Sequence, residues 1–245
     1  MFGFFNTLLD VDATRHASET APLSDETLRR TLGGKGLGIN LLLERNPANV
    51  DPLAPENQLI FAIGPVAATA VWGSCRHGVY TKSPQTGFLA ESYSGGTVAA
   101  RMARTGFDAV AIHGASPHPV WIEISDQDTV FHDASDFAGL DTYTTEDRVR
   151  AWIKENRPEA KNAGVITIGP AGENRVAFAV IENDYWRSAG RTGVGAVMGA
   201  KNIKAVAFWG NTEKTIADPD LVKHFSREMS ERSKQDKGVH NYKTM

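Results

Sequence analysis

Two arginines stand ahead of two glycine-rich turns, and this arrangement could bind an anion or the edge of a flat heterocycle. Arg76 lies in the run WGSCRHG, which precedes the turn Ser94-Gly95-Gly96, and Arg187 directly precedes the run SAGRTGVG. A guanidinium group offers several planar donors, and glycines let a ligand approach the backbone N–H groups at the start of a helix. The alternative interpretation is that the small residues only allow a helix to pack closely on a sheet.

The spacing of Gly193, Gly195 and Gly199 also resembles a dinucleotide-binding turn. Such a site requires a strand that ends directly before the first glycine, because the pyrophosphate lies between the end of the strand and the start of the helix. Here the strand expected at residues 175–181 ends near Ile181, and eleven residues separate it from Gly193. An NAD(P)-binding domain is therefore an alternative with unsuitable geometry.

Few other side chains are spaced for catalysis or for metal binding. The seven histidines include no H-E-x-x-H pair, and His77, beside Arg76, has either a role at the ligand site or a place in the core. The single cysteine, Cys75, excludes an internal disulfide and a cluster held by four thiolates of this chain. We assign no catalytic residue and no metal ligand.

The composition is that of a soluble globular protein. The chain has 245 residues, 41% of them hydrophobic and 22% charged, and a net charge of −3. No apolar run has the length of roughly eighteen residues that a membrane helix needs, and no global positive charge favours nucleic acid. The N-terminal run MFGFFNTLLD lacks the basic start of a signal peptide, so we expect a cytoplasmic protein without nucleic-acid or membrane partners.

Hydrophobic periodicity and turn residues predict a mixture of short strands and helices. The chain should begin with a strand or hairpin, and Ser24 or Asp25 should cap a helix that Gly33 and Gly34 interrupt before a second helix at 37–45. A helix near 144–160, capped by Thr144 or Thr145, should follow later. The strands and helices expected elsewhere are strands at 59–65, 78–84, 86–92, 107–114, 119–133 (a hairpin), 164–170 and 175–181, and a helix within 94–106.

The chain contains an internal duplication. Residues 59–65, LIFAIGP, match residues 164–170, GVITIGP, and residues 94–114 match residues 190–210 without a gap. Agreement of glycines, helix and closing strand at one offset indicates two related halves, roughly residues 50–115 and 160–210. We predict an α+β fold of two similar sheet-plus-helix halves in a pseudo-twofold arrangement. A ligand on that axis would itself tend to have two parts.

Several of these segments resemble the N-terminal domain of the aldehyde ferredoxin oxidoreductase family. They are RHGVYTKSPQTGF, SGGTVAARMARTGFDAVAIHG, IGPAGENRVAFAVI and RSAGRTGVGAVMGAKNIKAVAFWG, and the likeness extends from Phe2 to about Gly210. The resemblance implies that residues 1–210 form a domain whose two halves enclose a bis-pterin cofactor. In this family two pterins coordinate one tungsten or molybdenum through their dithiolenes.

The resemblance also implies which residues contact the cofactor. They are Arg76, Tyr93 with Gly95, and Arg187 with Ser188. Tyr93 stands where the family has asparagine, so a side-chain amide that could bond a pterin edge is missing, and its hydroxyl or backbone would have to substitute. Ser188 replaces an alanine, and Trp186 either lines the cofactor cavity or belongs to the core.

By the same resemblance, the complete enzyme oxidises an aldehyde with water to a carboxylic acid and passes two electrons through a 4Fe–4S cluster to ferredoxin. The cluster ligands and the catalytic acid and base are absent from this chain and would come from missing C-terminal domains or a companion subunit. The chain alone is then expected to be inactive, and assembly as a homo-oligomer stays open. The alternative is a non-catalytic remnant or partner-binding fragment.

The last segment, residues 211–245, resembles the first helix of a truncated or separately encoded helical domain. Asp218 or Asp220 can cap it, and Leu221, Val222 and Phe225 have helical spacing. We expect this apolar stripe to lack a partner within the chain.

Overall fold

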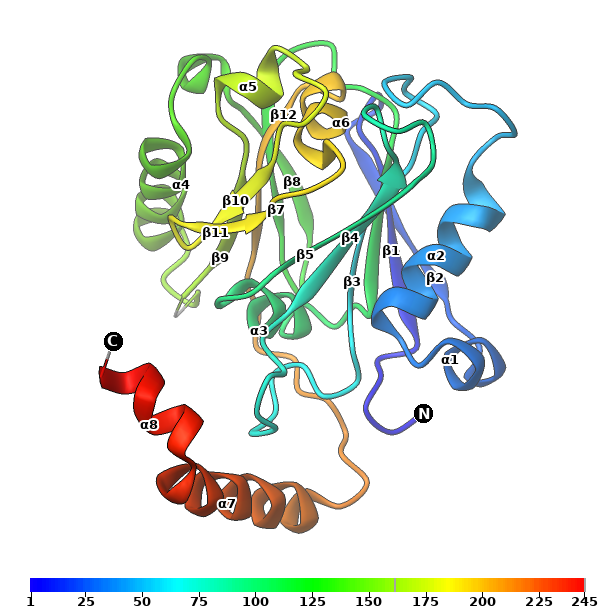
Figure 1. The fold of residues 1–245 in the computed structure, drawn as a ribbon. Helices are drawn as coiled ribbons and strands as arrows, with labels where there is room; N and C mark the ends of the chain where they lie inside the picture. Colours follow the sequence, from blue (N-terminus) through cyan, green and yellow to red (C-terminus); the bar gives the residue numbers. More distant parts are fainter. Residues whose placement is uncertain (161, 245) are drawn as a thin grey trace.

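Two mixed β-sheets with helices on and between them form the body of the protein (Figure 1). The computed structural model describes residues 1–160 and 162–244. Each sheet has six strands. The first has the spatial order β2 (Ala17–Pro22), β1 (Thr7–Asp12), β6 (Ala109–His113), β3 (Leu59–Ile63), β4 (His77–Lys82) and β5 (Leu89–Ser94). The second has the order β8 (Thr129–Asp133), β7 (Val120–Ile124), β12 (Ile203–Phe208), β9 (Gly164–Thr167), β10 (Ile181–Asn183) and β11 (Arg187–Ala189).

The two sheets have equivalent topologies, so the repeat extends beyond the segments that match in sequence. In each half a hairpin, β1–β2 or β7–β8, lies at one edge, and its first strand pairs in parallel with the last strand of that half. All other pairs among the described strands are antiparallel. The predicted equivalences of β3 with β9 and of β6 with β12 are confirmed, as is the α+β class. The hairpins are equivalent in position although no sequence match revealed them.

Helices cover the outer face of each sheet and fill the space between the sheets (Figure 1). The outer helices are α1 (Asp25–Thr31) and α2 (Gly34–Arg45) on the first sheet and α4 (Thr142–Asn156) on the second. Between the sheets lie α3 (Val98–Ala103) and α6 (Val194–Ala200), each the helix of a glycine-rich turn. The remaining short helices are α5 (Pro170–Glu173) and a 3-10 turn at Ser135–Phe137.

The central helices contact both sheets, including the sheet of the opposite half. Helix α3 of the first half contacts β9, where a Cβ on Gly164 would lie 2.9 Å from the Cα of Val98, and α6 of the second half contacts β4. The largest apolar cluster accordingly draws on both sheets, from Leu9 and Phe61 to Ile166 and Phe208. The two halves therefore share one core.

Most helix boundaries follow the predicted capping signals. Ser24 accepts a hydrogen bond from the Thr27 backbone and caps α1, and Leu32 in the left-handed conformation ends it before the predicted glycine break. The predicted cap of α4 was wrong: Asp141, not Thr144 or Thr145, accepts the hydrogen bond from the N-terminal backbone. Its carboxylate lies one residue ahead of the first helical residue, where a cap must be.

The predicted strand at 175–181 was also wrong. Residues 175–180 form turns, and strand β10 begins only at Ile181. Arg175 has a φ of 55°, which an extended strand does not allow. Strands β10 and β11 then form a short hairpin within the eleven residues that precede Gly193.

Helices α7 (Pro219–Gln235) and α8 (Lys237–Thr244) lie away from the sheets (Figure 1). Asp218 caps α7 as predicted, and no residue of α7 is buried. The apolar side chains of Leu221 and Phe225 are exposed, as expected for a stripe without a partner in this chain. None of the helices in the described ranges is both long and apolar enough to cross a membrane.

Candidate functional site

The five residues predicted to bind a ligand gather where the edge strands β5 and β11 approach each other. Tyr93 lies in β5 with Gly95 just beyond its end, and Arg187 and Ser188 belong to β11. Contacts join β5 to β11 directly. Arg76 precedes β4, whose first residue pairs with Ser94 of β5, so it lies next to the Gly95 end of that strand. The structure thus brings segments of both halves to one place.

Two free arginines mark this place. The side chains of Arg76 and Arg187 are exposed, and neither has a hydrogen-bond or ion-pair partner within residues 1–160 and 162–244. Trp186, beside Arg187, is 71% exposed, so of its two interpretations the place in the core is excluded. An indole face and two guanidinium groups suit a flat, hydrogen-bonding or anionic ligand.

Gly95 offers close access to the backbone in this region. A Cβ placed on this residue would meet no other atom within 4 Å, so the space above it is open. In contrast, the neighbouring Gly96 has a φ of 94°, and a Cβ there would lie 2.1 Å from the Asp184 carboxylate. The first glycine can therefore receive a ligand, while the second fits the protein itself.

The side chains of Tyr93 and Ser188 are already engaged within their own halves. The Tyr93 ring packs edge-on against Tyr80 at 6.2 Å, within the apolar cluster beneath α2, and its hydroxyl lies 3.5 Å from Glu91. Ser188 donates a hydrogen bond of 2.6 Å to Glu182 on the paired strand. At these two positions the backbone groups are therefore more available to a ligand than the side chains are.

The glycine-rich helix starts do not form anion sites. The N–H of Thr97 at the start of α3 donates to the Asp184 carboxylate, and that of Gly195 in α6 donates to the Ala179 carbonyl. A Cβ on Gly193 or Gly195 would lie 2.0 or 2.3 Å from a carbonyl oxygen of the preceding loop. The close-packing interpretation is therefore the right one for α6, and the space that a dinucleotide would need is filled by residues 177–180.

A histidine buried beside this region lacks hydrogen-bond partners. His77 is 1% exposed, and neither ring nitrogen has a partner within the described residues. Burial lowers the pKa of His77 to about 4, while the charge of Asp184 acts weakly in the opposite direction, so the imidazole is neutral near pH ~7. Of the two interpretations of His77, burial supports a place in the core.

A dipeptide that no sequence signal marked links the two halves at this site. Asn183 and Asp184 precede the β10–β11 turn and hydrogen-bond to residues 94–97 of the first half. Burial raises the pKa of Asp184, but hydrogen bonds from Thr97 and Asn183 outweigh it and hold that pKa below its ordinary value. From sequence alone, Asn-Asp before a turn indicates only turn geometry.

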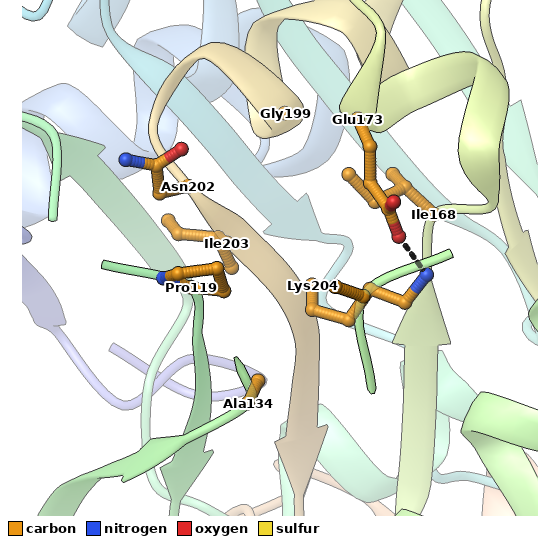
Figure 2. Close-up of a pocket in the computed structure, with 9 residues that line it drawn as sticks. Pro119, Ala134, Ile168, Glu173, Gly199, Asn202, Ile203 and Lys204 are labelled. Carbon is orange, nitrogen blue, oxygen red and sulfur yellow. Dashed lines mark hydrogen bonds and ion pairs between the residues drawn. The ribbon is translucent and has the colours of Figure 1, made fainter. Parts of the chain in front are cut away.

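The pocket in Figure 2 lies elsewhere, on the second half, and contains none of the five predicted residues. Its volume is ≈ 120 Å³, and Ile168 and Ile203 form part of its apolar wall. The Lys204 ammonium forms an ion pair with Glu173 across it and donates a further hydrogen bond of 2.8 Å to the Leu140 carbonyl. Both charges are satisfied inside the chain, so we assign this pocket no ligand.

No cluster of three or more histidine, cysteine, aspartate or glutamate side chains in the described part of the chain is arranged to hold a metal ion.

A comparison with protein families matches residues 8–210 to the model described as aldehyde ferredoxin oxidoreductase, N-terminal domain. The chain belongs to the aldehyde ferredoxin oxidoreductase family. The resemblance noted in the sequence is thereby confirmed for the domain that carries all five site residues.

Curated relatives of this family are 33–39% identical to the chain. The tungsten-containing aldehyde ferredoxin oxidoreductases of Pyrococcus abyssi and Thermococcus kodakarensis are each 39% identical over 236 residues, which is 96% of this chain. An aliphatic sulfonate oxidoreductase, WOR-like subunit, of Pyrococcus furiosus is 33% identical over 93% of the chain. The chain spans 38% of the length of each of these relatives.

A solved structure confirms the fold. The active site complex BamBC of benzoyl coenzyme A reductase, in complex with 1,5-dienoyl-CoA, contains a chain that superposes with a TM-score of 0.89 at 35% identity. The match covers 96% of this chain and 35% of that one. This N-terminal domain of the aldehyde ferredoxin oxidoreductase family is therefore also similar to part of a benzoyl coenzyme A reductase.

Proposed function

We propose that this chain is the cofactor-binding part of a tungsten- or molybdenum-containing bis-pterin oxidoreductase. The observation that supports it most is the pair of free arginines, Arg76 and Arg187, one from each half, in segments next to the strand end that carries the open backbone of Gly95. Two-part recognition by two halves suits a cofactor made of two pterins. The tungsten-containing relatives support the choice of cofactor.

The donor set fits such a group. Guanidinium groups form planar, charge-assisted hydrogen bonds with pterin edges and with phosphates. The open space over Gly95 admits a flat ring close to the backbone, and the exposed Trp186 indole offers a stacking surface.

In the proposed enzyme the bound metal supplies the redox chemistry, which oxidises an aldehyde with water to a carboxylic acid and releases two electrons. The residues of this chain bind and orient the cofactor. Arg76 and Arg187 would donate hydrogen bonds to it, and the open backbone near Gly95 would offer it further contacts. The 4Fe–4S cluster ligands, the proton-transfer groups and the surface for ferredoxin belong, in this proposal, to parts of the protein outside this chain or to a companion subunit.

Of the alternatives, the NAD(P)-binding domain loses its support because the glycines of α6 are covered by the chain itself. The non-catalytic remnant or partner-binding fragment retains one supporting observation. The asparagine amide of the family is replaced by Tyr93, whose side chain packs under α2 instead. These two hypotheses differ in whether the natural protein contains metal and pterin.

The test is elemental and pterin analysis of the natural protein, purified without oxygen from its own host with any polypeptide that accompanies it. We expect about one tungsten or molybdenum atom and about two pterins per chain. Arg76→Ala and Arg187→Ala should each lower that content several-fold, because each removes a charged hydrogen bond of about 1.5–3 kcal/mol. Arg29→Ala, an exposed arginine on α1, is the matched control.

Two results would contradict the proposal. A wild-type protein without metal and pterin would favour the remnant. Normal cofactor content in both arginine variants would show that the cofactor binds elsewhere.

A further inference from the structure

The dipeptide Asn183-Asp184 of the second half binds four polar groups of the first half. The Asp184 carboxylate accepts hydrogen bonds from the backbone N–H of Thr97, at 2.6 Å, and from its hydroxyl, at 2.8 Å. The Asn183 amide donates to the Gly95 carbonyl at 2.9 Å and accepts from the Ser94 hydroxyl at 2.6 Å. Residues 94–97 are therefore bound along their length by two adjacent side chains.

The second half holds these two side chains firmly. Arg150 of α4 donates to Asp184 at 3.1 Å, and the Asn183 amide donates to the same carboxylate at 2.9 Å. Arg150 is itself fixed by hydrogen bonds to the buried carboxylate of Glu146. The backbone N–H of Tyr185, next along the turn, also donates to Glu146, at 3.0 Å. The dipeptide is thus anchored to α4 as well as to the first half.

The loop of the first half is shaped to receive Asp184. Gly96 adopts a φ of 94°, and any side chain there would meet the carboxylate oxygen at 2.1 Å. Thr97 presents its N–H at the start of α3, where a carboxylate is also favoured by the helix dipole. The expected anion site at this helix start is therefore occupied by a group of the protein.

The same hairpin carries the second half's cofactor residues. Asn183 pairs directly with Arg187, and Glu182 pairs with Ser188. A displacement of the dipeptide relative to residues 94–97 would therefore change the separation between Gly95 and Arg187. Neither Asn183 nor Asp184 needs to touch the cofactor for this effect.

We propose that Asn183 and Asp184 are positioning residues, which fix the distance between the cofactor-binding segments of the two halves. This inference rests on the proposed function, because it assigns a purpose to the contact between the halves. It predicts that loosening the contact frees the loop at residues 94–97 first and shortens the lifetime of the bound cofactor, while the fold stays intact.

The first experiment needs no cofactor. In the 245-residue chain, hydrogen exchange of the Thr97 amide should become at least about tenfold faster in Asp184→Asn, since tenfold corresponds to about 1.4 kcal/mol and a charged hydrogen bond contributes at least this much. Amides of β6 should exchange as in the wild type. Thr97→Val, which removes only the hydroxyl contact, should also make the exchange of this amide faster. Thr97→Ser keeps a hydroxyl and should exchange at the wild-type rate.

The second experiment measures dissociation of the pterin from the complete natural protein by the fluorescence of the released, oxidised pterin. We expect at least severalfold faster release from Asp184→Asn and Thr97→Val than from the wild type or Thr97→Ser. Glu213→Gln is the matched control, because it removes another long-range bond to the region of α3, the 2.9 Å ion pair between Glu213, just after the second half, and Arg104, the residue that ends α3. Its release rate should be unchanged.

The outcomes separate the two proposals. A wild-type protein without pterin overturns the proposed function, and the exchange rates then decide alone whether the dipeptide holds the loop. Unchanged exchange in both variants overturns the inference. So does faster exchange with an unaltered rate of pterin release, because the contact would then be structural only.

Discussion

Among single residues, Glu123 shows how a buried charge is stabilised in this fold. Its carboxylate is fully buried and accepts hydrogen bonds from His132 at 2.8 Å, Arg157 at 2.7 Å and the Trp209 indole at 2.8 Å. Burial raises the pKa of Glu123, but these three donors outweigh it and lower the pKa to about 2. The group joins the end of α4 to two strands of the second sheet, and nothing in the sequence distinguished it from a surface glutamate.

We expect Glu123→Gln to destabilise the protein by about 3 kcal/mol, because it removes the buried charge that accepts hydrogen bonds from His132, Trp209 and the partly exposed Arg157. The pKa in the folded state lies below the unfolded value, so the carboxylate contributes its stability above pH ~4.5 and loses it as the pH falls towards ~2. Urea unfolding should show a difference between wild type and variant that is about 2 kcal/mol larger at pH 7 than at pH 3, because a folded-state pKa of about 2 leaves the carboxylate largely ionised at pH 3. Glu155→Gln, on the exposed face of α4, should behave like the wild type at both.

At the scale of elements, the glycines of α6 determine how closely this helix approaches its neighbours. A Cβ on Gly199 would lie 1.9 Å from the Gly172 carbonyl oxygen in α5, and one on Gly195 would lie 2.3 Å from that of Val180. The sequence predicted a glycine-rich turn followed by a helix, and this was correct. It could not identify the partner, because the residues in contact lie in the preceding loop, for which the apolar run at 175–181 wrongly indicated a strand.

Gly199→Ala should therefore destabilise the protein by about 2–4 kcal/mol, since a backbone carbonyl cannot move aside as a flexible side chain can. Gly190→Ala in the same segment is the control, because its added Cβ would meet only the Ser188 Cβ at 3.5 Å. The unfolding midpoint in urea measures both. A midpoint for the Gly199 variant that equals the control's would show that α5 and α6 are not packed so closely.

For the candidate site too, the sequence indicated which residues to consider but not which segments meet in space. Family resemblance located Arg76, Gly95 and Arg187, and the fold brings them together because β5 and β11 are equivalent edge strands that meet. Spacing alone could not reveal that meeting, since it depends on how two sheets are placed in space. Asn183 and Asp184 were missed for the same reason: their partners are about ninety residues away in the first half.

At the scale of the whole molecule, Lys201 forms another contact between the two halves, separate from that of the dipeptide Asn183-Asp184. It is 1% exposed, and its ammonium donates to the carbonyls of Pro55, at 2.9 Å, and Gly114, at 3.1 Å, both in the first half. Burial lowers the pKa of Lys201 to about 7, with a small opposing effect of Glu56. The hydrogen bonds of Lys201 have favourable geometry, but its ammonium charge is buried, so the stability that this contact contributes depends on pH.

Because the unfolded lysine keeps a pKa of about 10.4, the unfolded state binds more protons between pH ~7 and ~10, and stability should rise with pH in that window. We expect Lys201 to contribute a rise of about 2 kcal/mol between pH 7 and 9, which Lys201→Met should abolish. Unfolding free energies of both proteins at the two pH values test this. Lys154→Met, an exposed lysine, should keep the rise, and a rise that persists in Lys201→Met would place its origin in other groups.

The exchange of α3 and α6 across the two sheets has an evolutionary consequence. A chain of half this length would expose the inner face of its sheet and would have no opposite sheet for its helix, so it would need a second copy to bury both. The duplicated unit is in this sense a homodimer joined into one polypeptide. Within one polypeptide the two halves need not be identical, and the residues proposed to bind the cofactor differ between them, with Arg76 and Gly95 in one half and Arg187 and Ser188 in the other.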